Sequence, residues 1–299
     1  MKKMTTNPLT FRCKHRHSAL SHPNCYLKFL KGEGLAGPKI PKILVFDIET
    51  APLKAFVFQK SVWKANVGDE QVISEWFMLA WSAKWLFDEE VISMTLTGKE
   101  ARSEDDYRLV EGLWELFNQA DIIIAHNGDS FDIPNMNTRF IVNGFNPPKP
   151  YQTIDTKVIA KRQFGFTHNG LNALSKLFGM GEKRDVDFEL WKQCVDGNEA
   201  ALKEMELYNR DDVALLEQVY LKLRPWIKSH PNVGLYSLSD GAVCPNCGSE
   251  HITWLDGEYY YTQTSRYPIF VCECGAYGRS RKSDLTKEEK NNLVVGLAK

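Results

Sequence analysis

Residues 42–50 read KILVFDIET, an apolar run that ends in two carboxylates, Asp47 and Glu49. Side chains alternate between the two faces of a strand, so these carboxylates point one way while their neighbours point into packing. Two carboxylates on one face repel each other unless a cation lies between them, and oxygen ligands suit Mg²⁺ and Mn²⁺. The run before Asp47 predicts a strand that is covered on both faces. A solvated acidic turn is the alternative, and for this motif alone it is the stronger one.

The composition predicts a globular protein with one sizeable core and a small appendage, because 43% of the 299 residues are hydrophobic. The 37 Lys and Arg residues balance 38 Asp and Glu residues, so a nucleic-acid function must rest on local patches and on metal. The basic N-terminus has no apolar stretch of signal-peptide length, and no run approaches a membrane span. We expect a soluble cytoplasmic protein without a membrane partner.

The first 40 residues combine a Cys/His segment with a Gly- and Pro-rich linker. Thiolates and imidazoles are the donors that Zn²⁺ prefers, so this segment is a candidate zinc site. Its spacing matches no known ribbon or finger, so a basic loop with incidental histidines is the stronger interpretation, and such a loop could equally contact phosphates. The candidate ligands are Cys13, His15, His17, His22 and Cys25.

Two further strands are predicted at residues 77–87 and 90–98, joined by a tight turn at Asp88 and Glu89. They extend the first strand as an antiparallel sheet. A helix is then expected to start at Ser103, with Asp106 three residues later as its capping-box partner.

Residues 121–136, DIIIAHNGDSFDIPNM, predict a buried strand at Ile122–Ile124, a turn, and a helix with Asp132 near its start. A strand–helix–strand crossover makes this strand parallel to the first one. Asn127 and Asp132 should therefore reach the same edge of the sheet as Asp47.

The remaining helices and strand of this domain follow in order. Residues 151–155 predict a short strand, and Asp155 is interpreted as a cap for the helix after it. Residues 169–178 predict a helix with Leu171, Leu174 and Leu177 facing inward. Residues 198–226 form the longest helical pattern, in which Tyr208 and Asp212 are four apart and share a face.

The composition changes after residue 240, where two close cysteine pairs bracket aromatic-rich strands. Cys244, Cys247, Cys272 and Cys274 predict a zinc ribbon with one structural Zn²⁺, and Asp256-Gly257 is the expected hairpin turn. A disulfide or incidental clustering is the alternative.

The ribbon also carries aromatic and basic side chains, which either bind bases and phosphates or complete a small core. The residues concerned are Tyr259, Tyr260, Tyr261, Arg266, Tyr267, Arg279 and Arg281. Residues 283–299 are expected to form a polar, frayed tail.

These motifs together resemble the DEDD superfamily of 3′–5′ exonucleases. Asp47 and Glu49 match the first motif, D-x-E, and Asn127, Phe131 and Asp132 match the second. The third motif has a Y-x3-D form, matched by Tyr208 and Asp212, and an H-x4-D form that would need His where Leu207 stands. The chain is therefore similar to the tyrosine type, as in the proofreading exonuclease domains of family B DNA polymerases and their free-standing relatives.

The resemblance implies an α/β fold, a ribonuclease H-like mixed sheet flanked by helices. It covers roughly residues 40 to 228 and includes no polymerase domain. The expected organisation is an N-terminal segment and linker at 1–40, the exonuclease domain at 41–230, the zinc ribbon at 240–282 and the tail. An isolated exonuclease with a C-terminal ribbon resembles proteins of bacteriophage genomes, which would place it in the cytoplasm of a bacterial host.

The resemblance also implies two Mg²⁺ or Mn²⁺ ions. Asp47 is assigned to both ions, Glu49 and Asp212 to the ion on the nucleophile side, and Asp132 to the other ion through water. Tyr208 would orient the attacking water. Asn127 and Phe131 are candidates for contact with the terminal nucleotide, although Phe131 also fits a core position.

Three functions follow from this site. The first is a 3′–5′ exonuclease acting on DNA, at single-stranded ends. The second keeps the site but takes RNA or a branched DNA, since nothing in the sequence reads a 2′-hydroxyl. The third is a non-catalytic module that binds nucleic acid or replication and repair proteins. The four intact carboxylates argue against this third function, because a site without metal has no reason to keep charges that repel one another.

Overall fold

The computed structural model describes residues 11, 23–32, 41–58, 67–237, 239 and 241–296. The chain divides into two compact units, Lys42–Leu221 and the combination of Met1–Pro41 with Lys222–Lys299. In the described part of the chain, no helix has both the length and the apolar character needed to cross a membrane.

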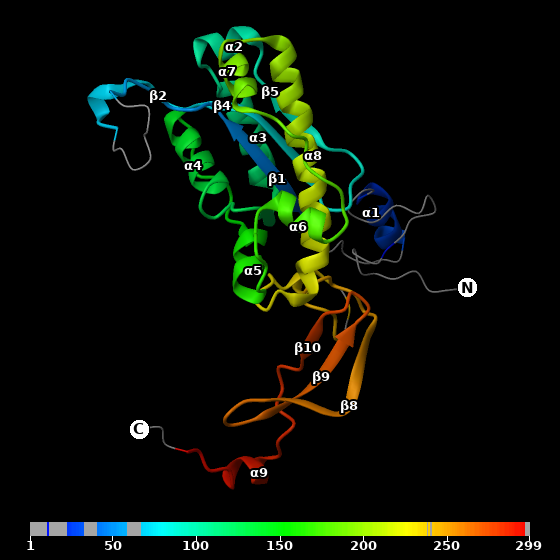
Figure 1. Ribbon diagram of the computed structural model, residues 1–299. Helices are drawn as coiled ribbons and strands as arrows, with labels where there is room; N and C mark the ends of the chain where they lie inside the picture. Colours follow the sequence, from blue (N-terminus) through cyan, green and yellow to red (C-terminus); the bar gives the residue numbers. More distant parts are fainter. Residues whose placement is uncertain are drawn as a thin grey trace. The chain divides into compact units, whose positions relative to one another are not determined.

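The larger unit is built on a five-stranded mixed sheet (Figure 1). Its order is β5-β4-β1-β6-β7, so the strand with the D-x-E motif lies in the middle. β4 pairs with β1 in the antiparallel sense and β6 pairs with it in the parallel sense, as predicted. The strands are β1 (Ile43–Thr50), β4 (Met78–Trp85), β5 (Ile92–Thr95), β6 (Ile122–Ala125) and β7 (Gln152–Asp155).

Helices cover both faces of this sheet, which confirms the predicted fold class (Figure 1). On one face Phe46 meets Phe117 of α3 (Tyr107–Gln119) edge-on, with 5.0 Å between ring centroids. α8 (Glu199–Leu223) crosses the other face, where Glu217 pairs with Lys84 of β4. β1 is therefore apolar on one side and free to present carboxylates toward α8 on the other.

The predicted helix start at Ser103 was wrong. Ser103 ends a short helix, α2 (Gly98–Ser103), which Thr97 and Glu100 cap with a capping box. Asp106 precedes α3 without capping it, because its carboxylate binds the Arg139 guanidinium at 2.6 Å. That ion pair joins α3 to α4 (Asp132–Val142).

Two smaller differences concern the helices before α8. In α6 (Leu171–Leu177) the first two leucines are buried, but Leu177 is 64% exposed because the helix ends there, so its inward placement was wrong. The sequence patterns did not predict α7 (Phe188–Val195), which Asp187 caps. The elements not yet named in this unit are β2 (Lys54–Ala55), η1 (Asp69–Gln71), β3 (Val72–Ser74) and α5 (Thr156–Gln163).

The smaller unit contains an antiparallel three-stranded sheet of order β10-β9-β8. Asp256-Gly257 lies inside β8, so the predicted hairpin turn was wrong. The turn is at 262–265, where the Thr262 amide donates to the Ser265 carbonyl at 2.8 Å. Gly257 has φ +74° and sits where the β8–β9 register shifts, so the glycine serves a bulge. The strands are β8 (Ile252–Tyr261), β9 (Arg266–Cys272) and β10 (Tyr277–Arg279).

The residues after the ribbon include a helix, α9 (Lys287–Asn291), in the stretch expected to be a frayed tail. Thr286 and Glu289 form its capping box, and Arg266 of β9 pairs with Asp284 and Glu289. The other elements of this unit are α1 (Pro23–Gly32), η2 (Arg224–Trp226) and η3 (Val233–Tyr236).

Candidate metal centre

Three carboxylates converge where β1 faces α8. Oxygen atoms of Asp47, Glu49 and Asp212 all lie within 4.8 Å of one another. The two-residue spacing on β1 puts the first two on one face, and α8 brings Asp212 across that face. Asn209, one helical turn before Asp212, donates from Nδ2 to Oδ2 of Asp47 at 2.7 Å. This hydrogen bond fixes the helix against the strand at the site.

Asp132 lies beside this group, at the first turn of α4. It is buried, and its Oδ1 accepts a hydrogen bond from the Ile48 amide at 3.3 Å. Its negative charge acts directly on Asp47, as the largest influence on that carboxyl group after burial. The structure therefore brings the four carboxylates predicted from the sequence into one place, three as a tight group and Asp132 next to them.

The cluster is electrostatically unfavourable without a cation. Burial, followed by the charges of Asp132, Glu49 and Asp212, raises the pKa of Asp47 well above its usual range. Burial and the Asp212 charge raise the pKa of Glu49 to about 8. Burial raises the pKa of Asp132 to about 7. Carboxyl groups that hold protons near neutral pH because they are buried close to one another are typical of metal-binding and catalytic sites.

Lys183 is a site residue that the sequence analysis missed. Its Nζ lies 2.5 Å from Oδ2 of Asp212 and 4.8 Å from the ring centroid of Tyr208. Burial opposes the ammonium charge, but the Asp212 charge and hydrogen bonds to Asp212 and Tyr208 outweigh it and raise the pKa of Lys183. Lys183 belongs to an irregular segment between α6 and α7, where no motif or periodicity marks it.

Tyr208 lies against the same cluster. Its ring packs edge-on against Trp191 of α7 at 6.1 Å between centroids, and the Trp191 side chain hydrogen-bonds to Glu49. Burial raises the pKa of Tyr208 above its usual value. The phenol is therefore protonated at neutral pH and suited to hydrogen bonding.

The cluster fits a hard divalent cation. Oδ1 of Asp212 is buried and has no hydrogen-bond partner among the described residues, although Oδ2 pairs with Lys183. Buried polar oxygens are normally hydrogen-bonded, so an unpartnered oxygen on a carboxylate that lies beside two others points to a missing ligand. An all-oxygen donor set suits Mg²⁺ or Mn²⁺.

The turn from β6 to α4 holds Asn127 and Phe131. Asn127 adopts φ +76°, and its amide donates to Oδ1 of Asp155 at 3.0 Å. The same Asp155 carboxylate caps α5, which confirms its structural interpretation. Phe131 is 41% exposed, so the core position considered for it was wrong, and its ring is available to a ligand.

Four cysteine sulfurs form a second cluster, in the ribbon. The Sγ atoms of Cys244 and Cys274 are 3.8 Å apart, and those of Cys247 and Cys272 are 3.5 Å apart. A disulfide requires about 2.05 Å. Tetrahedral Zn²⁺ with bonds of about 2.3 Å separates its sulfur ligands by roughly 3.8 Å. The spacing therefore supports a closed zinc ribbon.

The N-terminal zinc prediction stays a prediction. Cys13, His15, His17 and His22 lie outside the described residues. Cys25 is on α1, where it packs against a small cluster of Phe11, Tyr26 and Leu30.

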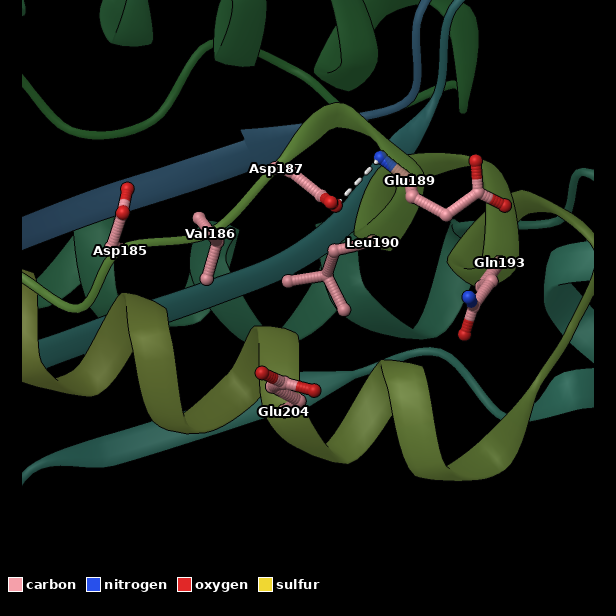
Figure 2. A pocket seen from close by; sticks show the side chains of 7 residues that line it. All are labelled: Asp185, Val186, Asp187, Glu189, Leu190, Gln193 and Glu204. Carbon is pink, nitrogen blue, oxygen red and sulfur yellow. Dashed lines mark hydrogen bonds between the residues drawn. The ribbon is translucent and has the colours of Figure 1, made fainter.

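A pocket is lined by α7, by the segment that leads into it and by Glu204 of α8 (Figure 2). The Asp187 carboxylate at this pocket caps α7, because it accepts a hydrogen bond from the Glu189 amide at 3.0 Å. Four of the lining side chains are carboxylates, so the pocket repels phosphate groups. The lining residues are Asp185, Val186, Asp187, Glu189, Leu190, Gln193 and Glu204.

Comparisons with known proteins give a family for this chain. The family model of the RNase H superfamily matches residues 44–224, more than half of the chain. The family B DNA polymerase from the hyperthermophilic archaeon Pyrobaculum calidifontis is similar over 68% of this chain, with 16% identity and a TM-score of 0.44. The match spans 26% of the polymerase chain. No curated protein matches. On the family match, this chain belongs to the RNase H superfamily.

Proposed function

We propose that the protein is a metal-dependent 3′–5′ exonuclease that hydrolyses the phosphodiester bonds of DNA at single-stranded ends. The observation that carries this proposal is the convergence of Asp47, Glu49 and Asp212, with Asp132 beside them. Membership of the RNase H superfamily supports a nuclease. The order and spacing of the D-x-E and Y-x3-D motifs support the exonuclease class.

The four carboxylates would hold two Mg²⁺ or Mn²⁺ ions. Asp47 is central to this arrangement because it feels the charges of the other three. When bound, two such ions lower the pKa of a nucleophilic water and neutralise charge that develops on the phosphate. Asn209 keeps one Asp47 oxygen in place through its hydrogen bond. The four cysteines would hold one Zn²⁺, which leaves no open position and is therefore structural.

Tyr208 and Lys183 act next to these carboxylates. The protonated phenol of Tyr208 would orient the attacking water by hydrogen bonding. Lys183 holds Tyr208 and Asp212 together and brings a positive charge to the place where a phosphate must enter. Its compact ammonium suits a phosphate oxygen.

The terminal nucleotide would meet the β6–α4 turn. Phe131 presents an exposed ring at this turn, one residue before Asp132. An exposed ring next to a carboxylate cluster can stack on a base while the phosphate lies at the carboxylates. Asn127, held in a left-handed conformation, would contact the same nucleotide.

The proposal is tested with two neighbouring aspartates of α8. Asp212 is a buried member of the cluster, whereas Asp211 is solvent-accessible and pairs with Arg184. We expect Asp212→Asn to abolish Mg²⁺- or Mn²⁺-dependent release of mononucleotides from single-stranded DNA, and Asp211→Asn to leave it within about twofold. Equal rates for the two variants, or no cleavage by the well-folded, metal-loaded wild type, would contradict the proposal.

A further inference from the structure

One face of the C-terminal sheet has the features of a binding surface. This surface, the tyrosine face, consists of Tyr260, Tyr267, Ile269, Val271, Tyr277 and Arg279. We propose that the tyrosine face binds single-stranded polynucleotide. The inference rests on the proposed function, which makes a polynucleotide the ligand of this chain, and adds a second contact surface to it.

Strand register places these side chains together. Tyr260 of β8 is paired with Tyr267 of β9, and on the other edge Tyr277 and Arg279 of β10 are paired with Val271 and Ile269. Residues paired across strands share a face, and alternate residues of one strand do too. None of the six is buried, and Tyr260 and Tyr277 are 53% and 68% exposed.

Arg279 supplies the positive charge of this face. Its guanidinium carbon lies 4.2 Å from the ring centroid of Tyr267 and 5.3 Å from that of Tyr260. Its hydrogen bond is to the Ser280 carbonyl, and no carboxylate of the described residues pairs with it. The face therefore combines flat rings with a guanidinium whose charge is not neutralised.

The opposite face of the same sheet is different. Arg266 also lies over a tyrosine, with 5.2 Å to the ring centroid of Tyr259, but Asp284 and Glu289 neutralise it. On that face Trp254 packs edge-on against Phe270. Phe270 is buried there in the small core of the ribbon, together with Cys244, Cys272 and Ala276.

Single-stranded nucleic acid is the occupant that this chemistry fits. Its bases offer exposed ring faces to the tyrosines, and its phosphates offer negative charge to Arg279. A duplex keeps its bases stacked on one another, so it cannot use the rings. DNA and RNA share both features. The affinities for a DNA and an RNA oligonucleotide therefore show which of the two sugars the surface prefers.

The test measures binding rather than cleavage. The full chain carrying Asp47→Ala is titrated into fluorescent oligo(dT) and oligo(rU) of about 20 nucleotides, and anisotropy gives the Kd. No chelator is used, so that the ribbon keeps its metal. Tyr260→Ala, Tyr277→Ala and Arg279→Ala are compared with Tyr261→Ala. Tyr261 is the matched control because it lies on the same strand and is 69% exposed. It stands opposite Arg266 in the β8–β9 register, so its side chain is on the other face of the sheet.

We expect each tyrosine-face variant to weaken binding roughly tenfold, and Tyr261→Ala to change it less than about twofold. Arg279→Ala should also reduce the slope of log Kd against log salt by about one. Tyr260→Leu should bind as weakly as Tyr260→Ala, because leucine lacks the aromatic ring. Since leucine still covers the sheet with an apolar side chain, this variant separates loss of the ring from a folding defect.

Two results would overturn the inference: equal Kd values for Tyr260→Ala, Tyr277→Ala and Tyr261→Ala, or a duplex that binds as tightly as the single strand. Because binding is measured in a variant that does not cleave, a failure of the exonuclease proposal would appear only in the cleavage assay. The two failures are therefore distinguishable.

Discussion

Lys183 and Asp212 form an ion pair inside a cluster of carboxylates, with Nζ 2.5 Å from Oδ2. The pair connects an irregular segment to the helix that completes the candidate metal centre. Burial raises the pKa of Asp47, Glu49 and Asp212, and the positive charge of Lys183 partly offsets this rise in all three. In the absence of a divalent ion it is therefore a partial counter-ion for the site.

Removal of this counter-ion should destabilise the metal-free protein. Lys183→Met leaves Asp212 buried beside other carboxylates, and breaking a buried pair costs about 3 kcal/mol in the free energy of unfolding. Mn²⁺ should restore part of the loss. Lys192→Met is the control, because Lys192 forms an exposed, solvent-screened pair with Glu189 whose loss should change the free energy of unfolding little. Urea unfolding measures both variants, and similar losses would contradict this role of Lys183.

The stability of the metal-free protein should fall as the pH rises from about 6.5 to about 8.5. Burial raises the pKa of Glu49 to about 8 and that of Asp132 to about 7, whereas unfolded carboxyl groups titrate near pH 4. The folded state therefore binds more protons in this range, so the free energy of unfolding decreases with pH. His126 works in the opposite direction, because burial lowers its folded pKa to about 4 while an unfolded histidine titrates near pH 6.5. Its contribution is small, since most of that titration is complete above pH 6.5.

Urea midpoints at the two pH values measure this slope. Glu49→Gln should flatten it, and added Mn²⁺ should reduce it. Glu100→Gln is the control, since a hydrogen bond from Arg108 lowers the pKa of Glu100 to about 2 and that group does not titrate in this range. If stability falls with pH as steeply in Glu49→Gln as in Glu100→Gln, the carboxylate cluster is not the source of the slope.

Asn209 should support catalysis without touching the substrate. It donates to one Asp47 oxygen at 2.7 Å, and loss of such a partner of a metal ligand costs roughly 10- to 100-fold in metal affinity or activity. We expect Asn209→Ala to raise the Mn²⁺ concentration needed for half-maximal cleavage. Gln218→Ala, which removes an exposed amide farther along α8, should leave it unchanged. A half-maximal concentration that is the same in the two variants would contradict the role of Asn209.

The ribbon should contain about one zinc ion per chain. Cys274→Ser should lose it, because this residue belongs to the four-sulfur cluster. Cys194→Ala should keep it, since Cys194 is buried in the hydrophobic core of the larger unit. Elemental analysis of the purified proteins decides the point, and zinc retained by Cys274→Ser would exclude the four-cysteine site.

The sequence predicted the sheet and its carboxylates because both depend on local patterns. The strand of Asp47 and the strand at Ile122–Ile124 are marked by continuous apolar runs, and Tyr208 and Asp212 by helical spacing. Their convergence follows from the crossover connection, which places the two strands side by side in parallel.

What the sequence could not predict depends on packing between distant segments. Lys183 reaches Asp212 only because the loop before α7 folds back on α8, and one lysine in a charged loop carries no local signal. Asp106 fits a capping box by spacing, but Arg139 binds its carboxylate instead. Asp256-Gly257 has the composition of a hairpin turn, yet cross-strand pairing makes it part of a bulge.

The most direct test of the exonuclease proposal is the polarity of degradation. Single-stranded DNA labelled at either the 5′ or the 3′ end is incubated with Mg²⁺ or Mn²⁺ and with wild-type protein or Asp47→Ala. The account predicts a ladder of 5′-labelled products that shorten stepwise, immediate release of the 3′ label as a mononucleotide, and neither in the variant. Degradation from the 5′ end, or activity that survives Asp47→Ala, would contradict it.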